Sequence, residues 1–466
     1  MSAAALRLDA PVWRSQALNF HLAVPLQVCL CVIPAMAAVA VGQPRVGAAL
    51  FFAILAPILG FHIVRWDPMS YGSVLLGVTP VLMVLRGVFL YSSVEVLFAI
   101  GLLLWLLVGG GDAKAVQSRQ VLTLLAVSFA YWLSSFILVG NYNANFRAIE
   151  LSLAAINVFL LSRHRSYLAS GLISTLLSVT IYGAAIAPHV NSDSYRLGVA
   201  KIDGEHLGNP ISFGLAAALV LLLTVTDNGR WILVGKRPWL RGVASLACVV
   251  LLLLSTSRGS WLVVVVGVAI LFWYDPRQRF RIAAAFAGIL IVGILLTSFG
   301  HDATLSHYLD KTFDPDQSWS KRTTGRDVMW KAIPHLLHDS PVWGFGPGSG
   351  LRTAKIYYHE NLIWHSLYLQ VAAETGLSGL FLVLFLMVVA THRCYTRFRI
   401  TGELAPLVGM IGFWCVGITV PGLDAASACF LGFGLIGADY SHLYLIRRAA
   451  PPQAQLEASA LVAVAP

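Results

Sequence analysis

A histidine at the edge of an apolar segment is the residue of this sequence best suited to moving a proton. His365 stands where a polar segment meets an apolar run. Imidazole has an unperturbed pKa of about 6.5, so it can accept or release a proton near neutral pH. A helix through this segment would place Asn361, His365, Tyr368 and Ala372 on one face. We interpret Tyr368 as a candidate substrate-binding residue. The alternative is that His365 is a hydrogen-bonded structural group.

Arginine and lysine residues in polar segments indicate a second kind of chemistry, the binding of an anion. Arg258 lies in the polar turn Ser255–Ser260 between two apolar runs. Its planar guanidinium suits phosphate oxygens, although it could instead brace the ends of the two runs through backbone carbonyls. Together, the candidates predict a polyanion at the membrane boundary, such as a lipid pyrophosphate, although any one of them alone could be a solvated charge. The other cationic candidates are Arg147, Arg196, Lys201, His206, Lys321, Arg322 and Arg326.

Three further patterns resemble ligand sites, and we interpret none of them as one. Asp314-Pro315-Asp316 resembles the metal-binding motif of enzymes that use nucleotide sugars, but those sugars are cytoplasmic and this segment is expected outside. His335 and His338 share a helix face without an evident third ligand. The glycines of Gly344–Gly350 lack nucleotide-binding spacing and predict a tight turn that seats its loop on the bundle. We therefore expect neither a metal nor another cofactor.

The elements that position these residues must be membrane helices. The chain has 466 residues, of which 58% are hydrophobic and 12% charged, whereas soluble domains are about 25% charged. Apolar runs recur from Ala17 almost to the C-terminus, and about 20 residues suffice for one crossing. We predict an all-α polytopic membrane protein with about 12 (12–14) transmembrane helices. The net charge of +10 is spread over short loops, as expected for orientation signals, so nucleic acid is not an expected partner.

The distribution of Lys and Arg predicts the orientation of the chain. Short basic loops of membrane proteins lie in the cytoplasm, and residues 393–399 are interpreted as one of them. Both termini are then cytoplasmic, and the candidate residues and the turn Gln43 to Arg45 lie on the opposite, external face. A helix from Gly325 towards His338, kinked at Pro334, is expected within the long external loop. The expected organisation is a transmembrane bundle (1–299), the long loop (300–361), C-terminal transmembrane helices (362–446) and a disordered cytoplasmic tail (447–466).

Several short segments, in this order, resemble the O-antigen ligase/polymerase superfamily. The segment Trp364 to Gly379 resembles the superfamily's signature of a histidine followed by Tyr-Leu and later by Glu-x-Gly. The individual motifs are weak, and their order along about 195–390 makes them more specific. The other matching segments are Ser257-Arg258-Gly259, Gly325-Arg326 to Trp330, Gly344 to Gly348 and, more loosely, Gly204 to Pro210.

The resemblance implies a GT-C-like bundle with a helical periplasmic loop region and an inverting glycosyltransferase activity. The implied donor is an undecaprenyl-pyrophosphate-linked saccharide, and the implied acceptor is a sugar hydroxyl of the lipid A-core in lipopolysaccharide synthesis. No metal or ATP would be needed, because the pyrophosphate is already a good leaving group. By resemblance, His365 would act as the general base, while Arg258 and Arg326 would bind the pyrophosphate.

Other functions remain open on the sequence. An O-antigen polymerase would use the same donor and a second lipid-linked repeat, and a protein O-oligosaccharyltransferase would use Ser or Thr. The single long external loop and the moderate length favour the ligase. A transporter of lipid-linked saccharides is the alternative of another class. It predicts charges in mid-span on several helices, whereas Arg86 is the clearest cation within an apolar run.

Overall fold

The fold is described from a computed structural model of the chain. Continuous stretches and scattered positions of the chain are described. The stretches are 22–89, 93–108, 142–162, 164–189, 200–202, 205–207, 210–226, 238–255, 257–274, 326–346, 349–358, 364–420 and 429–432, and the scattered positions lie within 123–137 and 279–291 and at 434.

Helices, most of them apolar, make up most of the described part of the chain, which confirms an all-α, multi-pass membrane protein. Five helices are long and apolar enough to cross a bilayer: α1 (Ala23–Ala40), α2 (Pro44–Val64), α3 (Pro68–Phe89), α8 (Arg165–Ile186) and α17 (Leu367–Thr401). Six shorter apolar helices accompany them: α4 (Ser93–Val108), α7 (Tyr142–Leu161), α9 (Pro210–Thr226), α10 (Pro238–Ser255), α11 (Arg258–Tyr274) and α18 (Ala405–Thr419). The expected total of about 12 spans stays a prediction, since part of the chain lies outside the described residues.

Small residues hold the N-terminal helices together. The hydroxyl of Ser178 on α8 donates to the carbonyl of Gly77 on α3 at 2.6 Å, and Thr175 donates to Leu76 at 3.0 Å. A Cβ at Gly77 would lie only 2.6 Å from that of Ser174. Close backbone approach and interhelical hydrogen bonds are how helices associate in lipid, where the hydrophobic effect between them is weak. The N-terminal helices therefore form a firmly packed layer.

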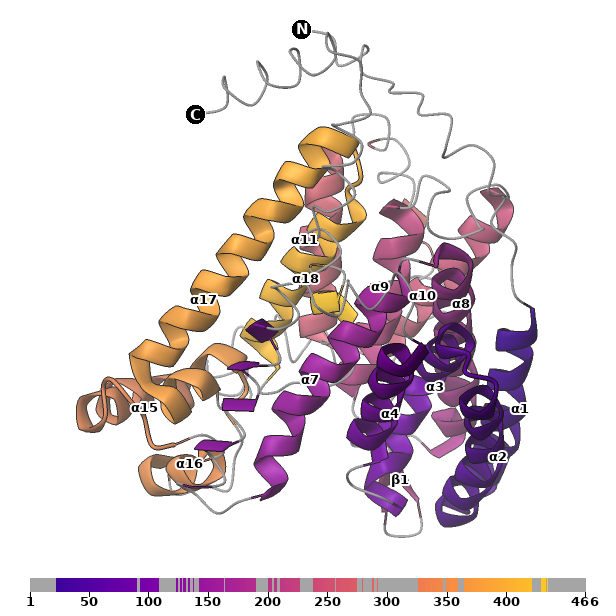
Figure 1. The fold of residues 1–466 in the computed structure, drawn as a ribbon, viewed down its shortest axis with the longest axis horizontal. Helices are drawn as coiled ribbons and strands as arrows, with labels where there is room; N and C mark the ends of the chain where they lie inside the picture. The colour runs from indigo at the N-terminus through magenta and orange to yellow at the C-terminus, as the bar shows by residue number, and fades with distance from the viewer. Residues whose placement is uncertain are drawn as a thin grey trace, which may run out of the picture.

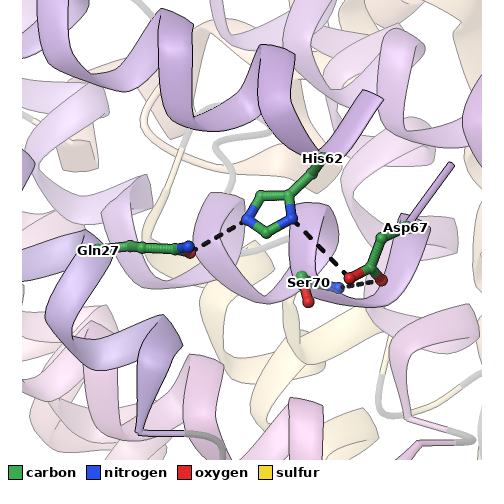
Figure 2. A network of polar contacts seen from close by, with 4 residues as sticks. All are labelled: Gln27, His62, Asp67 and Ser70. Atoms are coloured by element: carbon green, nitrogen blue, oxygen red, sulfur yellow. Dashed lines mark hydrogen bonds and ion pairs between the residues drawn. The ribbon is translucent and has the colours of Figure 1, made fainter. Parts of the chain in front are cut away.

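A polar network joins α1, α2 and α3 at the end of α2 (Figure 2). The ring of His62 lies 3.1 Å from Gln27 of α1 and 3.9 Å from the carboxylate of Asp67. Asp67 also accepts a hydrogen bond from the backbone N–H of Ser70 at 3.0 Å, capping the start of α3. His62 is thus a linking residue of the helix layer.

One end of the bundle carries the features that the sequence placed outside the membrane (Figure 1). The α1–α2 turn, strand β1 (Ala200–Ile202) and helices α15 (Arg326–Asp339) and α16 (Gly350–Tyr358) all lie at this end. Strand β1 pairs antiparallel with β2 (Glu205–Leu207), a hairpin that the sequence did not predict. The buried side chains of Ile202 and Leu207 anchor the hairpin on the helices. We call this end of the bundle the loop end.

The basic stretch at 393–399, interpreted from sequence as a cytoplasmic loop, is helical. It forms the last turns of α17, which ends with Gly402 in the left-handed conformation at φ 70°. Arg397 donates to Glu403 from Nε at 3.1 Å and from Nη2 at 2.6 Å, and the two side chains are only 5% and 9% exposed. This buried ion pair fixes the turn between α17 and α18, and so the register in which the two helices run back to the loop end.

Replacing Glu403 by Ala should destabilise the protein strongly. The change leaves the Arg397 guanidinium buried without this carboxylate, and breaking one side of a buried pair costs about 3–5 kcal/mol. Thermal unfolding in detergent measures the effect. Arg399→Ala, at an exposed position of the same helix end, is the matched control and should unfold near the wild-type temperature. Equal unfolding temperatures for the two variants would contradict a structural role for the pair.

Candidate functional site

Arg258 is held at the loop end by a turn of buried serines. It is the first residue of α11, and its side chain is partly exposed. Beneath it, Ser260 and Ser257 join their hydroxyls at 2.8 Å, and Ser255 accepts from the backbone N–H of Ser257 at 3.4 Å. A Cβ on Gly214 of α9 would lie 2.5 Å from the Ser260 hydroxyl, so α9 packs directly against this turn. The start of a helix also presents unpaired N–H groups and a positive potential, which add to the charge of Arg258.

His365 lies in an extended segment before α17. The helix begins at Leu367, and Ser366 has extended backbone angles of φ −160° and ψ 132°. The prediction that His365, Tyr368 and Ala372 share a face of one helix is therefore wrong. The helical spacing of Asn361, His365, Tyr368 and Ala372 runs through this segment, so the sequence gave no sign of the extended residue. His365 instead lies two residues before the first residue of α17, and it is partly exposed.

The residues on either side of His365 are both fixed. Trp364 is 1% exposed and donates from its indole nitrogen to the hydroxyl of Thr353 on α16 at 3.2 Å. Ser366 is buried and donates from its hydroxyl to the carbonyl of Gly417 on α18 at 3.1 Å. The backbone of His365 is therefore stretched between α16 and α18. Such a position is rigid enough for a group that must meet a substrate in one orientation.

The last turn of α18 brings the arginine turn and the histidine segment together. Gly259, next to Arg258, packs so closely on Thr419 that a Cβ there would collide with the threonine hydroxyl. Two residues before Thr419, Gly417 accepts the bond from Ser366. Arg258 and His365 are thus each one residue away from a contact with the same helical turn.

Tyr368 braces α17 against α18. Its hydroxyl donates to the carbonyl of Trp414 at 2.8 Å, and its ring would be 2.8 Å from a Cβ placed on Gly417. This candidate therefore lies beside the site, with its hydroxyl hydrogen bound to the backbone.

The remaining sequence candidates fall in different places. Arg326 is the first residue of α15, and Arg147 lies in the first half of α7. Lys201 and His206 face each other as register partners in the hairpin, which sequence alone did not reveal. Arg196, Lys321 and Arg322 lie outside the described residues.

Helices α15 and α16, with residues 340–346 between them, form a cap over the start of α17. Its small core contains Ala332, Leu336, Ala354, Trp364 and Ala373. The cap is closed on its outer side by a 2.5 Å hydrogen bond from the Tyr357 hydroxyl to the Asp339 carboxylate. This bond lowers the pKa of Asp339, while partial burial and the carboxylate raise the pKa of Tyr357 to about 12. The cap is therefore a structural unit that includes the residue next to His365.

The glycine turn seats the cap on α17, as the sequence predicted. Gly344 has φ 66°, and Gly376 interrupts α17 with φ 67° and ψ −166°. The interruption leaves backbone groups that the turn uses: Phe345 N–H donates to the carbonyl of Ala373 at 3.0 Å, and Leu377 N–H donates to that of Pro341 at 2.8 Å. A Cβ on Gly344 would lie 2.5 Å from the Gly376 nitrogen. Only glycine fits at both positions.

A buried acid beside this interruption was not among the sequence candidates. Glu374 is 0% exposed and accepts a hydrogen bond from the Gln370 amide at 3.0 Å. A carboxylate inside an apolar run is costly, and that cost was the signal that could have identified it. On the cap surface, Arg352 and Lys355 of the unpredicted helix α16 are exposed cations that were also missed.

The two histidines weighed as metal ligands are solvated. His335 and His338 are exposed on α15, and His338 lies 3.4 Å from Asp339. Among the residues that the structure describes, no group of three or more His, Cys, Asp or Glu could hold a metal ion. The Asp314-Pro315-Asp316 pattern lies outside the described residues.

A protein-family model matches the segment of the chain that contains this site. The family model described as O-antigen ligase matches residues 243–384, which include Arg258, Arg326, His365 and Tyr368. The match over this segment supports a member of the O-antigen ligase superfamily. The match supports a ligase/polymerase type of function, a glycosyltransferase-like activity on lipid-linked glycans. No curated protein matches the chain. Arg147, Arg196, Lys201 and His206 precede the matched segment, so the family assignment does not extend to them.

Alanine at Gly344 or Gly376 should loosen the cap. Each change adds a Cβ where backbone already lies, in addition to the about 1–2 kcal/mol that a left-handed conformation costs other residues. Gly402→Ala is the matched control, because Gly402 has φ 70° but no atom within 4 Å of a new Cβ. Hydrogen exchange over α15 and α16 should rise at least tenfold in the first two variants and stay near wild type in the third. Unchanged exchange in the Gly376 variant would refute the seating role.

Proposed function

We propose that the protein ligates O-antigen polysaccharide from undecaprenyl pyrophosphate onto the lipid A-core. The reaction would take place at the periplasmic face of the bacterial inner membrane, with both termini cytoplasmic, and without metal or ATP. The observation that carries the proposal is that the last turn of α18 supports both Arg258 and His365, two residues of the matched segment. A cation at a helix start and an imidazole supported by the same helical turn are the two groups that we assign to this transfer.

Arg258 has the role of receiving the pyrophosphate. Its guanidinium can contact two phosphate oxygens at once, and the start of α11 adds N–H groups with the same polarity. When the bond between the sugar and the pyrophosphate breaks, negative charge grows on the departing oxygen. Fixed positive groups stabilise that charge, which lowers the barrier. Arg326, at the start of α15, has the same role from the cap side.

His365 has the role of the base. The acceptor hydroxyl oxygen attacks the anomeric carbon from the face opposite the pyrophosphate, so the configuration inverts. The hydroxyl proton passes to the imidazole, and the bonding electrons leave with undecaprenyl pyrophosphate. Fixation of Trp364 and Ser366 on either side favours one imidazole position relative to Arg258, and positioning supplies much of the catalysis in such reactions.

The other polar candidates would bind the glycan or the lipid head group. Lys201 pairs with His206 in the register of the hairpin, whose strand β1 lies at the loop end, and Arg147 lies in the first half of α7. Arg196, Lys321, Arg322 and Tyr368 complete the proposed set of substrate-binding residues. Cations around an entrance raise the local concentration of an anionic substrate.

Replacing His365 by Ala should lower transfer by about 10²–10⁴-fold, the range that a general base contributes. The assay reconstitutes the protein with an undecaprenyl-pyrophosphate glycan and lipid A-core, without ATP or divalent metal. His335→Ala, which removes an exposed histidine of the cap, is the matched control and should transfer at the wild-type rate. A His365 variant that is folded and inserted normally yet fully active would disprove the base assignment.

Replacing Arg258 by Ala should weaken donor binding and slow transfer, and Arg258→Lys should restore only part of both, because lysine lacks the bidentate geometry. Donor binding is measured separately with the unreactive lipid pyrophosphate. Unchanged binding and rate in the Ala variant would remove the pyrophosphate role. Product that forms only on a second lipid-linked repeat would establish a polymerase in place of the ligase.

A further inference from the structure

One face of α17 is apolar and exposed from Leu377 to Val388. Leu377, Phe381, Phe385 and Val388 are exposed, with Phe381 at 72%. Their spacings of four, four and three residues place them on a single helix face. In a span this apolar, such a face contacts lipid. Figure 1 shows α17 along the edge of the bundle opposite α1 and α2, as a lipid-facing helix requires.

The cap turn continues this lipid-facing stripe. The carbonyl of Val342 accepts from the hydroxyl of Ser378 at 2.7 Å, and Leu377 donates to Pro341, so the turn lies against the end of the stripe. Trp343 follows directly and is 79% exposed. A soluble surface rarely leaves an indole so open, whereas tryptophan is enriched where hydrocarbon meets head groups.

The two cap helices show the same combination of apolar and cationic groups. On α16, the exposed Ile356 shares a face with Arg352 and Lys355. On α15, the exposed Trp330 is followed by the exposed Lys331. Among the described side chains of the cap, Asp339 is the acid that opposes these cations, and it is already bound by Tyr357. Apolar groups flanked by cations are the composition of helices that lie on anionic membrane surfaces.

We propose that the cap docks on the bilayer surface, with Trp343 in the head-group layer and Arg352 and Lys355 on the phosphates of anionic phospholipids. The occupant of this surface is the membrane in which α17 stands, because the exposed turn is continuous with the lipid-facing stripe. The Gly344–Gly376 contact would then hold His365 at a fixed depth relative to the head groups. The inference does not depend on which glycan is transferred.

The test places an environment-sensitive label at single positions of the full-length chain. Trp343→Cys and Val342→Cys probe the docking surface, and the second of these keeps the indole. His338→Cys is the matched control on the same cap, at a position whose side chain is 88% exposed. The unsubstituted chain measures background labelling of its six native cysteines, five of which are buried. Each protein is reconstituted into vesicles of phosphatidylcholine, with or without phosphatidylglycerol, that contain a lipid-borne quencher.

Labels at 342 and 343 should be quenched several-fold more than the label at 338, and phosphatidylglycerol should increase the difference. Adding Arg352→Gln and Lys355→Gln should remove that increase, since each cation near an anionic surface is worth roughly fivefold in the docking equilibrium. Quenching in pure phosphatidylcholine should persist in this variant. Equal quenching at 342, 343 and 338 would overturn the proposal. Labels shielded from water yet untouched by the lipid quencher would also overturn it, because a protein would then cover the surface.

Discussion

The backbone contact between Gly344 and Gly376 is the constraint on which the functional end depends. Interrupting α17 at Gly376 exposes the carbonyl of Ala373 and the N–H of Leu377, and the turn at 340–346 pairs with both. Buried backbone groups must find partners, so the interruption and the turn require each other. Through this contact α15 and α16 cover the start of α17, and Trp364 is buried between them. The position of His365 follows from that of Trp364.

Helix α18 supports the proposed site from the direction opposite to the cap, and this second support explains why the site needs several helices. The last turn of α18 touches Gly259 through Thr419 and Ser366 through Gly417. The small residues at these points let backbones approach, which is the general way of packing helices in lipid. An imidazole and a guanidinium from distant parts of the sequence thereby share one scaffold. The buried Arg397–Glu403 pair holds the other end of the same α17–α18 unit.

Much of the fold could be predicted from the sequence because hydropathy and charge are local signals. They identified the membrane helices, the serine and arginine turn before α11, and a helix through Pro334. The structure also confirmed that the Gly344 turn seats a loop on the bundle. What failed depended on tertiary contacts. The extended Ser366 lies at the start of an apolar run, and its bond to Gly417, a tertiary contact, shows why the helix starts later.

The same reasoning explains the other errors. Residues 393–399 looked like a loop because three arginines lie close together, yet Arg397 has a buried partner in Glu403 that lies beyond the helix end. The hairpin at 200–207 is stabilised by burial of Ile202 and Leu207 against the bundle, and such short strands carry little propensity of their own. The roles proposed for the site residues come from the chemistry of their side chains and from family resemblance.

The interruption at Gly376 also decides how α17 meets the thickness of the bilayer. Its 35 residues would measure about 50 Å as a continuous helix, whereas the hydrocarbon layer is about 30 Å thick. The part after Gly376, at about 37 Å, is long enough to cross alone. The short part before it begins beside His365 and contains Tyr368 and Glu374. This part does not have to cross the hydrocarbon layer. The long part can therefore adjust to a thinner or thicker membrane by changing its tilt, while the short part stays beneath the cap.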